Sequence, residues 1–339
     1  MTRPHPRVLL ALALVLLSSA LLAACGGSGD DGGGSAKADS PQALLEKTFR
    51  ASSTQIARAR VAASFRLDPE GLLKLGGPLA FRLTGPFAAR TDAPARFDFD
   101  ILATLGGQKF KGGAISTGVK RFLRLDDRAF ALRRGTRPSA SNGARHGLDM
   151  LGLDPVSWVR NVRDAGQERV GGVQTTHLAG DVDARSLLTD VGALLDKAGD
   201  GSGSLLSPEL LDQIAGAVKS AKVDVWTGAD DSILRQIAVS ARFAFKASQS
   251  PIVGLDGGKI TLRVRLDDVN GAPVEVQAPA GTQPLSDVTG SGGLGAVLGG
   301  LSQGLTGGIG NGAIELVSCV TGAGGSSVEL VRCISKLSR

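Results

Sequence analysis

The strictest alternation of apolar and polar residues in the chain is the stretch Lys259-Ile260-Thr261-Leu262-Arg263-Val264-Arg265-Leu266-Asp267. Its aliphatic residues share one face of an extended strand, because successive side chains of a strand point to opposite faces. Threonine, arginine and aspartate occupy the other face. The stretch therefore predicts a strand with one face on a core and the other in water, which is typical of an antiparallel sheet.

The same period of two recurs along much of the chain, between turns rich in Gly, Pro and Asp. Further strands are expected at 55–67, 79–89, 95–105, 108–116, 120–125, 128–133, 162–170, 173–182, 222–227 and 233–245. Helices are expected from Ser40, a cap followed by Pro41, to about residue 53, and at 184–198 and 208–221. The sum is an α+β fold, a large antiparallel sheet with a few helices against one face.

The first residues have the features of a secretory signal. Arg3 and Arg7 precede an uncharged apolar segment, 8–22, which is too short to span a bilayer as a stop-transfer helix. The segment closes with Leu22-Ala23-Ala24-Cys25, the pattern of a bacterial lipobox. We therefore predict a lipoprotein signal peptide over 1–24 and a diacylglyceryl anchor on Cys25, which places the protein outside the cytoplasm on the cell membrane.

Composition divides the rest of the chain into three parts. A Gly/Ser/Asp tether at 25–39 precedes the body at 40–280, and a Gly-rich connector with a cysteine-containing tail fills 281–339. With Cys25 assigned to lipid, Cys319 and Cys333 remain as a pair in a compartment that permits oxidation. A disulfide is expected between them, and two unpaired buried thiols are the alternative.

Charge and histidine content exclude several classes of function. The 38 basic and 32 acidic residues of the whole chain give +6, and without Arg3 and Arg7 the 36 remaining basic residues leave an excess of +4. This excess is too small to indicate nucleic acid binding. The basic residues are dispersed along strand-like segments, so at most weak attraction to anionic lipid is expected. The histidines lie far apart in sequence, and neither a metal site nor another cofactor is predicted.

Three passages carry a family resemblance. They are Val170-Gly171-Gly172-Val173-Gln174-Thr175-Thr176-His177-Leu178-Ala179-Gly180-Asp181-Val182-Asp183, then Val223-Asp224-Val225-Trp226 with Ile233-Leu234-Arg235-Gln236-Ile237, and finally Pro273-Val274-Glu275-Val276-Gln277-Ala278-Pro279. In this order they resemble the mycobacterial LppX/LprG-type lipoproteins, whose fold is similar to that of the LolA and LolB carriers. The resemblance covers residues 40–279.

The resemblance implies a half-barrel sheet wrapped around helices, with an apolar cavity that holds lipid acyl chains. It also implies a lipid or glycolipid as partner, carriage across the cell envelope, and an envelope transporter as a candidate partner protein. The candidate cavity residues are Leu187, Leu188, Val191, Leu194, Leu195, Val225 and Ile237. The same leucines also fit an ordinary core. The alternative function is a non-catalytic envelope scaffold that binds another protein.

Enzyme-like motifs do not fit their required context. Residues 290–295 match GxGxxG without a preceding strand, and 300–304 match GxSxG around Ser302 with no later histidine. His177 lies about 13 Å along a strand from Asp181, too far for a His–carboxylate pair, so a structural histidine is expected. We predict a protein that is not an enzyme, and hydrolase is kept only as the least favoured class.

Overall fold

In the computed structural model, the described residues are 39–71, 77–89, 94–105, 107–132, 155–190, 208–246, 255–289 and 313–337. The predicted signal peptide, the lipobox with Cys25, and the enzyme-like motifs at 290–304 lie outside them. So do nearly all of the tether and three of the cavity candidates, Val191, Leu194 and Leu195.

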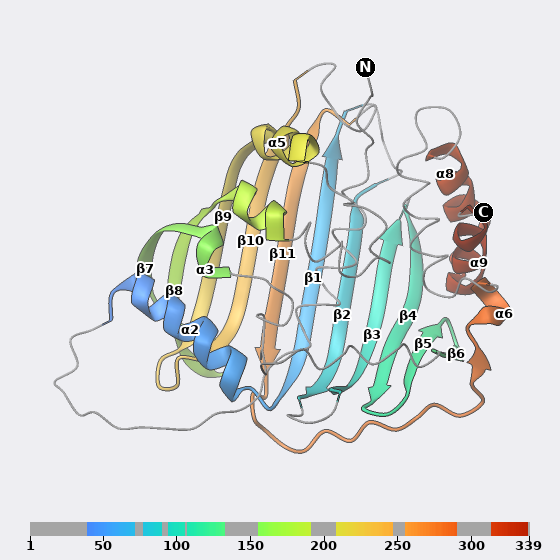
Figure 1. Ribbon diagram of the computed structural model, residues 1–339, viewed down its shortest axis with the longest axis horizontal. Helices are drawn as coiled ribbons and strands as arrows, with labels where there is room; N and C mark the ends of the chain where they lie inside the picture. Colours follow the sequence, from blue (N-terminus) through green and yellow to red (C-terminus); the bar gives the residue numbers. More distant parts are fainter. Residues whose placement is uncertain are drawn as a thin grey trace.

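The described strands form one 12-stranded sheet in the order β12-β6-β5-β4-β3-β2-β1-β11-β10-β9-β8-β7 (Figure 1). The strands are β1 (Arg58–Glu70), β2 (Leu79–Ala88), β3 (Arg96–Leu105), β4 (Gln108–Thr117), β5 (Arg121–Leu125), β6 (Arg128–Ala131), β7 (Val159–Val170), β8 (Val173–Val182), β9 (Val218–Gly228), β10 (Leu234–Ala244), β11 (Gly257–Asp267) and β12 (Gln283–Pro284). Neighbouring strands are antiparallel except β12 and β6. The predicted α+β fold with a large, curved antiparallel sheet is confirmed.

The helices lie on one face of this sheet, which we call the inner face (Figure 1). They are α2 (Pro41–Gln55), α3 (Pro155–Trp158), α5 (Pro208–Ala217), α6 (Ser286–Thr289), α8 (Ala313–Gly322) and α9 (Ser327–Leu337), and residues 184–190 are also helical. Leu45 and Phe49 of α2 pack with Val223 and Val225 of β9. At the other end of the sheet, α8 and α9 pack on Phe110 of β4. The helices therefore cover the two ends of the inner face.

Helix α2 begins where the sequence indicates. The Ser40 hydroxyl accepts a hydrogen bond from the Ala43 N–H at 3.2 Å, and Pro41 occupies the first turn. The Thr48 hydroxyl, fully buried, donates to the Leu44 carbonyl at 2.7 Å and accepts from the Thr227 hydroxyl at 2.9 Å, which ties α2 to β9. This bond satisfies two polar groups that would otherwise be costly to bury.

Helix α5 ends earlier than the apolar spacing of 208–221 predicts. It stops at Ala217, and the next residues belong to β9, with Val218 opposite Phe243 and Ser220 opposite Arg242 of β10. Backbone pairing along the full length of β10 outweighs the local helical preference of these residues. The prediction of a helix over 218–221 is wrong for this reason.

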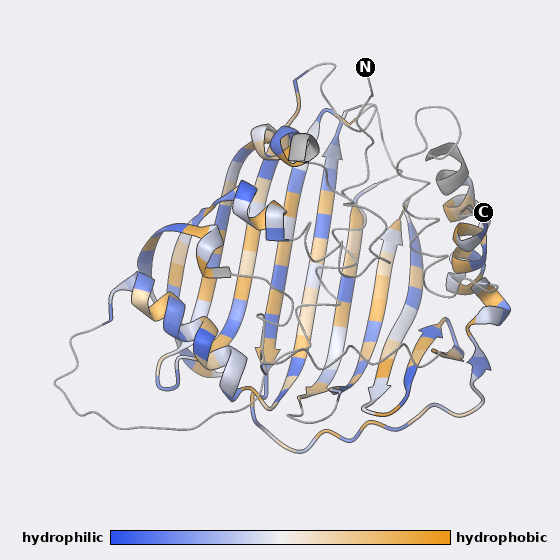
Figure 2. Ribbon diagram, in the orientation of Figure 1, coloured by the Kyte–Doolittle hydropathy of each residue, from blue (hydrophilic) through white to orange (hydrophobic). Residues whose placement is uncertain are grey.

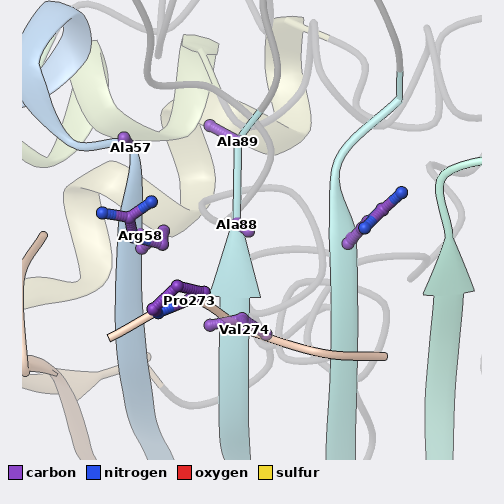
Figure 3. A pocket seen from close by; sticks show the side chains of 7 residues that line it. Ala57, Arg58, Ala88, Ala89, Pro273 and Val274 are labelled. Atoms are coloured by element: carbon purple, nitrogen blue, oxygen red, sulfur yellow. The ribbon is translucent and has the colours of Figure 1, made fainter. Parts of the chain in front are cut away.

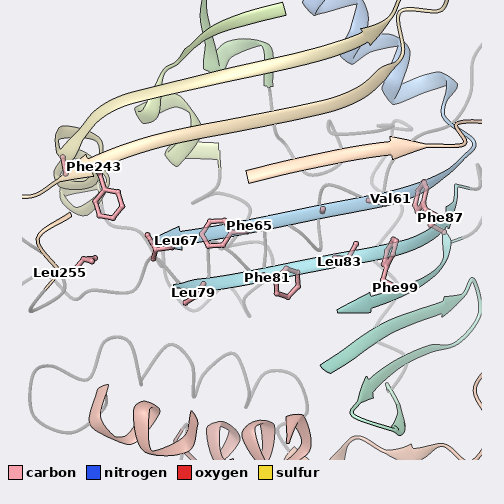
Figure 4. Packing of buried hydrophobic residues seen from close by; sticks show 13 residues of the cluster. Val61, Phe65, Leu67, Leu79, Phe81, Leu83, Phe87, Phe99, Phe243 and Leu255 are labelled. Atoms are coloured by element: carbon pink, nitrogen blue, oxygen red, sulfur yellow. The ribbon is translucent and has the colours of Figure 1, made fainter. Parts of the chain in front are cut away.

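The largest buried cluster lies on the inner face of β1 and β2 (Figure 4). Its best buried members include Val61, Phe65 and Leu83. Gly85 in β2 allows β3 to approach, because a Cβ there would lie 2.0 Å from the carbonyl oxygen of Asp98. The core is thus a layer of side chains between the sheet and the segments that cover it.

The C-terminal helices are fastened to this sheet. Cys319 of α8 and Cys333 of α9 form a disulfide with a Cα–Cα distance of 5.6 Å, so the predicted pairing is confirmed. Asp126, in the turn between β5 and β6, accepts hydrogen bonds from the Ser327 N–H at 3.0 Å and the Val328 N–H at 3.2 Å. A carboxylate distant in sequence therefore caps the N-terminus of α9.

Asp126 remains ionised to lower pH than an ordinary aspartate. Partial burial raises the pKa of Asp126, but hydrogen bonds from the Ser327 and Val328 backbone and from the Ser326 and Ser327 hydroxyls outweigh this effect. The pKa therefore lies below the usual 3.8. Because the folded-state pKa is lowered, the stabilisation is complete above the unfolded-state pKa and is lost as the pH falls through the folded-state pKa.

Removing the disulfide is expected to destabilise the C-terminal helices. In the double variant Cys319→Ser/Cys333→Ser the unfolded chain regains freedom in a loop of about 15 residues, which costs about 3 kcal/mol of unfolding free energy. Urea unfolding followed by circular dichroism measures this loss. Reductant should lower the midpoint of the wild type and leave that of the double variant unchanged. Equal midpoints for both proteins would contradict the expectation.

Replacing the cap tests the role of its charge. Asp126→Asn keeps a side chain that tolerates the positive φ of 54° at this position and removes the carboxylate. We expect a loss of about 0.5–1 kcal/mol at neutral pH, which disappears as the pH falls below about 4. Asp127→Asn, at the exposed neighbouring position, is the matched control. A loss independent of pH would show that the charge is not responsible.

Candidate functional site

A strip of half-buried aliphatic side chains runs along the inner face of β10 and β11. Its residues, which we call the central strip, are Ile237, Val239, Ile260, Leu262, Val264 and Leu266. The register sets Ile237 opposite Val264 and Val239 opposite Leu262. The strip is therefore a continuous apolar surface two strands wide, and the alternating bands on these strands are visible in Figure 2.

The strands on either side of the central strip are packed more completely. On β1, Val61 is 1% and Phe65 is 4% exposed, and on β9, Val223 is 3% and Val225 is 1% exposed. The central strip thus separates two filled clusters and remains partly uncovered itself. The aliphatic carbon of the strip that is still exposed retains a driving force for burial of about 25 cal/mol per Å². Such a surface can hold a flexible apolar chain, and its side chains carry no group for acid–base or nucleophilic chemistry.

The predicted cavity residues fall into different surroundings. Ile237 belongs to the central strip, whereas Val225 is buried in the cluster beneath α2. In the helical segment 184–190, Leu187 is half-buried and Leu188 is buried. A role of these residues in lipid contact stays a prediction. The β11 members of the strip were expected only as a core face, because alternation reveals which face is apolar but not how completely it is covered.

A small pocket lies on the opposite face of the sheet, which we call the outer face, at the ends of β1, β2 and β3 (Figure 3). It has a volume of about 230 Å³ and is lined by Ala57, Arg58, Ala88, Ala89, Arg96, Pro273 and Val274. The Arg58 Nε donates to the Gly271 carbonyl at 3.1 Å, and the buried Arg96 Nε has no hydrogen-bond partner among the described residues. The pocket is smaller than typical ligand sites and does not suit an acyl chain.

His177 lies in a cluster of polar side chains from neighbouring strands. Its Nδ1 lies 3.1 Å from a Glu168 oxygen and its Nε2 lies 2.9 Å from an Asp224 oxygen, and its ring stacks on Trp226 at 4.4 Å between centroids. Both ring nitrogens are therefore engaged, and the side chain is only 14% exposed. The partners come from β7 and β9, and residue spacing within β8 does not reveal them.

The aspartates near His177 in sequence bind elsewhere. The Asn161 amide donates to Asp181 at 2.9 Å, and Lys222 forms an ion pair with the same carboxylate. The Asn161 and Lys222 hydrogen bonds hold the pKa of Asp181 below its usual value. Backbone hydrogen bonding from Ser186 likewise lowers the pKa of Asp183. These carboxylates stabilise strand and helix ends.

Within the described segments, no group of three or more His, Cys, Asp or Glu side chains is arranged to hold a metal ion. No helix among the same residues is both long and apolar enough to cross a membrane.

Comparison with known proteins gives matches among solved structures. No family model matches the chain, and no curated protein matches it. The lipoprotein LppX from Mycobacterium tuberculosis is 17% identical, with a TM-score of 0.36 over 70% of this chain and 98% of that one. LprF from Mycobacterium bovis is 13% identical, with a TM-score of 0.36 over 71% and 97%. A LolA superfamily protein from Nitrosomonas europaea is 12% identical, with a TM-score of 0.18 over 68% and 95%. The resemblance predicted from the sequence motifs thus recurs among the solved structures, at low identity.

Proposed function

We propose that this protein is a lipid-anchored envelope protein that binds the acyl chains of a lipid or glycolipid on the central strip, with no catalytic step. The observation that carries the proposal is the partial burial of six aliphatic residues between two filled clusters. An apolar ligand would complete the burial of these side chains, and each buried CH₂ group contributes about 0.8 kcal/mol. The lipobox supports a location at the membrane, where such ligands are abundant.

The length of the central strip suits an acyl chain. From Ile260 to Leu266, β11 extends for about 20 Å at roughly 3.3 Å per residue. One leaflet of a bilayer has a hydrocarbon layer of about 15 Å, half of the full core. The strip is therefore long enough to accept the whole tail of a membrane lipid. In the envelope, a protein that binds a lipid in this way would carry it between membranes, with a transporter as partner.

Lipid loading tests the proposal. Residues 26–339, which lack the predicted signal and anchor and keep every described residue, are incubated with phospholipid or glycolipid and analysed by native mass spectrometry. Val239→Glu places a carboxylate in the strip, and we expect the lipid adduct to fall at least about tenfold because burial of an unpaired charge is costly. Ser240→Glu, at the exposed neighbouring position, should load like the wild type.

Thermal melting of both variants establishes that each is folded when loading is measured. A wild-type mass without lipid, resistant to loading, would overturn the proposal and favour the scaffold function. Crosslinking in cells would then be expected to show one stable protein partner.

The anchor is tested in the full chain. In a bacterial host that processes lipoproteins, Cys25→Ala should abolish labelling by a palmitate analogue. The double variant Cys319→Ser/Cys333→Ser should keep both the label and the membrane location. Labelling that survives Cys25→Ala would contradict the assigned anchor.

A further inference from the structure

The outer face of the four central strands is strongly basic. On β2, β1, β11 and β10 it carries the exposed cations Arg60, Arg66, Arg82, Arg242, Lys259, Arg263 and Arg265, which we call the basic face. The carboxylates on the same strand faces are Asp68, Glu70 and Asp267. Positive charge therefore dominates the outer face of these four strands.

This concentration is created by strand pairing. The cations are scattered over just more than two hundred residues of sequence, from Arg60 to Arg265, and the alternation within each strand places them on the outer side. The register then brings the strands together: Ser64 of β1 lies between Arg82 of β2 and Arg263 of β11, and Arg242 of β10 lies directly opposite Lys259. The sequence-based expectation of dispersed charge does not describe the folded surface.

Several of these cations have no acidic partner. Arg66 pairs with Asp68 at 2.7 Å and Arg265 pairs with Asp267 at 2.9 Å, which engages two of the three carboxylates. Among the residues that the structure describes, Arg82, Arg242 and Arg263 form no ion pair. Like charges directly opposite on neighbouring strands destabilise a sheet, so the stability of the fold does not account for this arrangement.

We propose that the basic face docks on an anionic lipid surface. Guanidinium groups bind phosphate through paired N–H donors. The register places Arg82 and Arg263 two strands apart, with Ser64 between them, which is a spacing of about 10 Å. Small side chains such as Ala62, Ser64 and Ala238 stand between the cations and leave room for headgroups to approach. Every anionic leaflet presents repeated phosphates to which several of these cations can bind at once.

Docking in this way orients the molecule. The helices and the central strip lie on the inner face and would be directed away from the membrane, toward a partner in the envelope (Figure 1). The proposal requires no ligand on the central strip and therefore stands apart from the proposed function.

The proposal is tested by measuring the binding of a protein that consists of residues 26–339 to lipid vesicles. Sedimentation with vesicles of phosphatidylcholine containing phosphatidylglycerol is compared with vesicles of phosphatidylcholine alone. We expect binding to the anionic vesicles only, and its loss in high salt, where the screening length falls to about 3 Å at 1 M. In the triple variant Arg82→Glu/Arg242→Glu/Arg263→Glu, affinity should fall by more than about 100-fold, since each cation near such a surface contributes roughly fivefold and three are reversed.

The matched control changes the same net charge elsewhere. Lys47→Glu/Arg50→Glu/Lys336→Glu reverses three exposed cations on α2 and α9, and its affinity should stay within about threefold of the wild type. If the Glu variant does not fold, the milder variant Arg82→Gln/Arg242→Gln/Arg263→Gln replaces it, and its affinity is expected to fall by about 100-fold.

Three outcomes would overturn the proposal. They are no binding to anionic vesicles, equal binding to neutral vesicles, and equal losses in the basic-face variant and its control. Lipid loading of the basic-face variant in native mass spectrometry should match the wild type, which separates this proposal from the one made for the central strip.

Discussion

The fold depends on the pairing of β1 with β11. These strands are about two hundred residues apart, and they form an unbroken antiparallel ladder from Arg60 opposite Asp267 to Glu70 opposite Gly257. The ladder joins the N-terminal strands β1 to β6 and the strands β7 to β11 into one sheet. Without it, each half would expose an edge strand with unpaired backbone groups. A slip of one residue would also exchange the two faces of β11 and bury its arginines.

The same ladder gives the sheet two chemically distinct faces. Aliphatic and aromatic side chains of both halves meet on the inner face, where the helices cover the two ends. Between the covered ends, β10 and β11 keep a partly uncovered apolar strip. Arginines of both halves lie on the outer face. Strand pairing brings together positive charges that are far apart in the sequence. An apolar strip on one side and a cationic surface on the other are therefore two results of one register.

Contacts between distant segments also fix the ends of the molecule. Asp126 in a hairpin turn caps α9, and the disulfide ties α9 to α8, so the segment expected as a tail packs against β4. At the opposite end, His177 joins β7, β8 and β9 through Glu168 and Asp224. Each of these polar groups is satisfied by a partner from another strand or helix, as burial requires.

Most of the long strands, the start of α2 at Ser40, the α+β class and a disulfide between the two remaining cysteines could be predicted from the sequence. These features follow from local periodicity, from a cap next to its helix and from an even number of remaining thiols, all of which can be read along a short stretch. The sequence also identified Ile237 as a candidate for the apolar site. Other features follow only from the tertiary structure. They are the order of the strands, the end of α5 at Ala217 where β9 begins, the partial burial of the apolar residues of β11, and the gathering of distant arginines on one surface. Register and burial arise from contacts between residues far apart in the chain, and no local pattern encodes them.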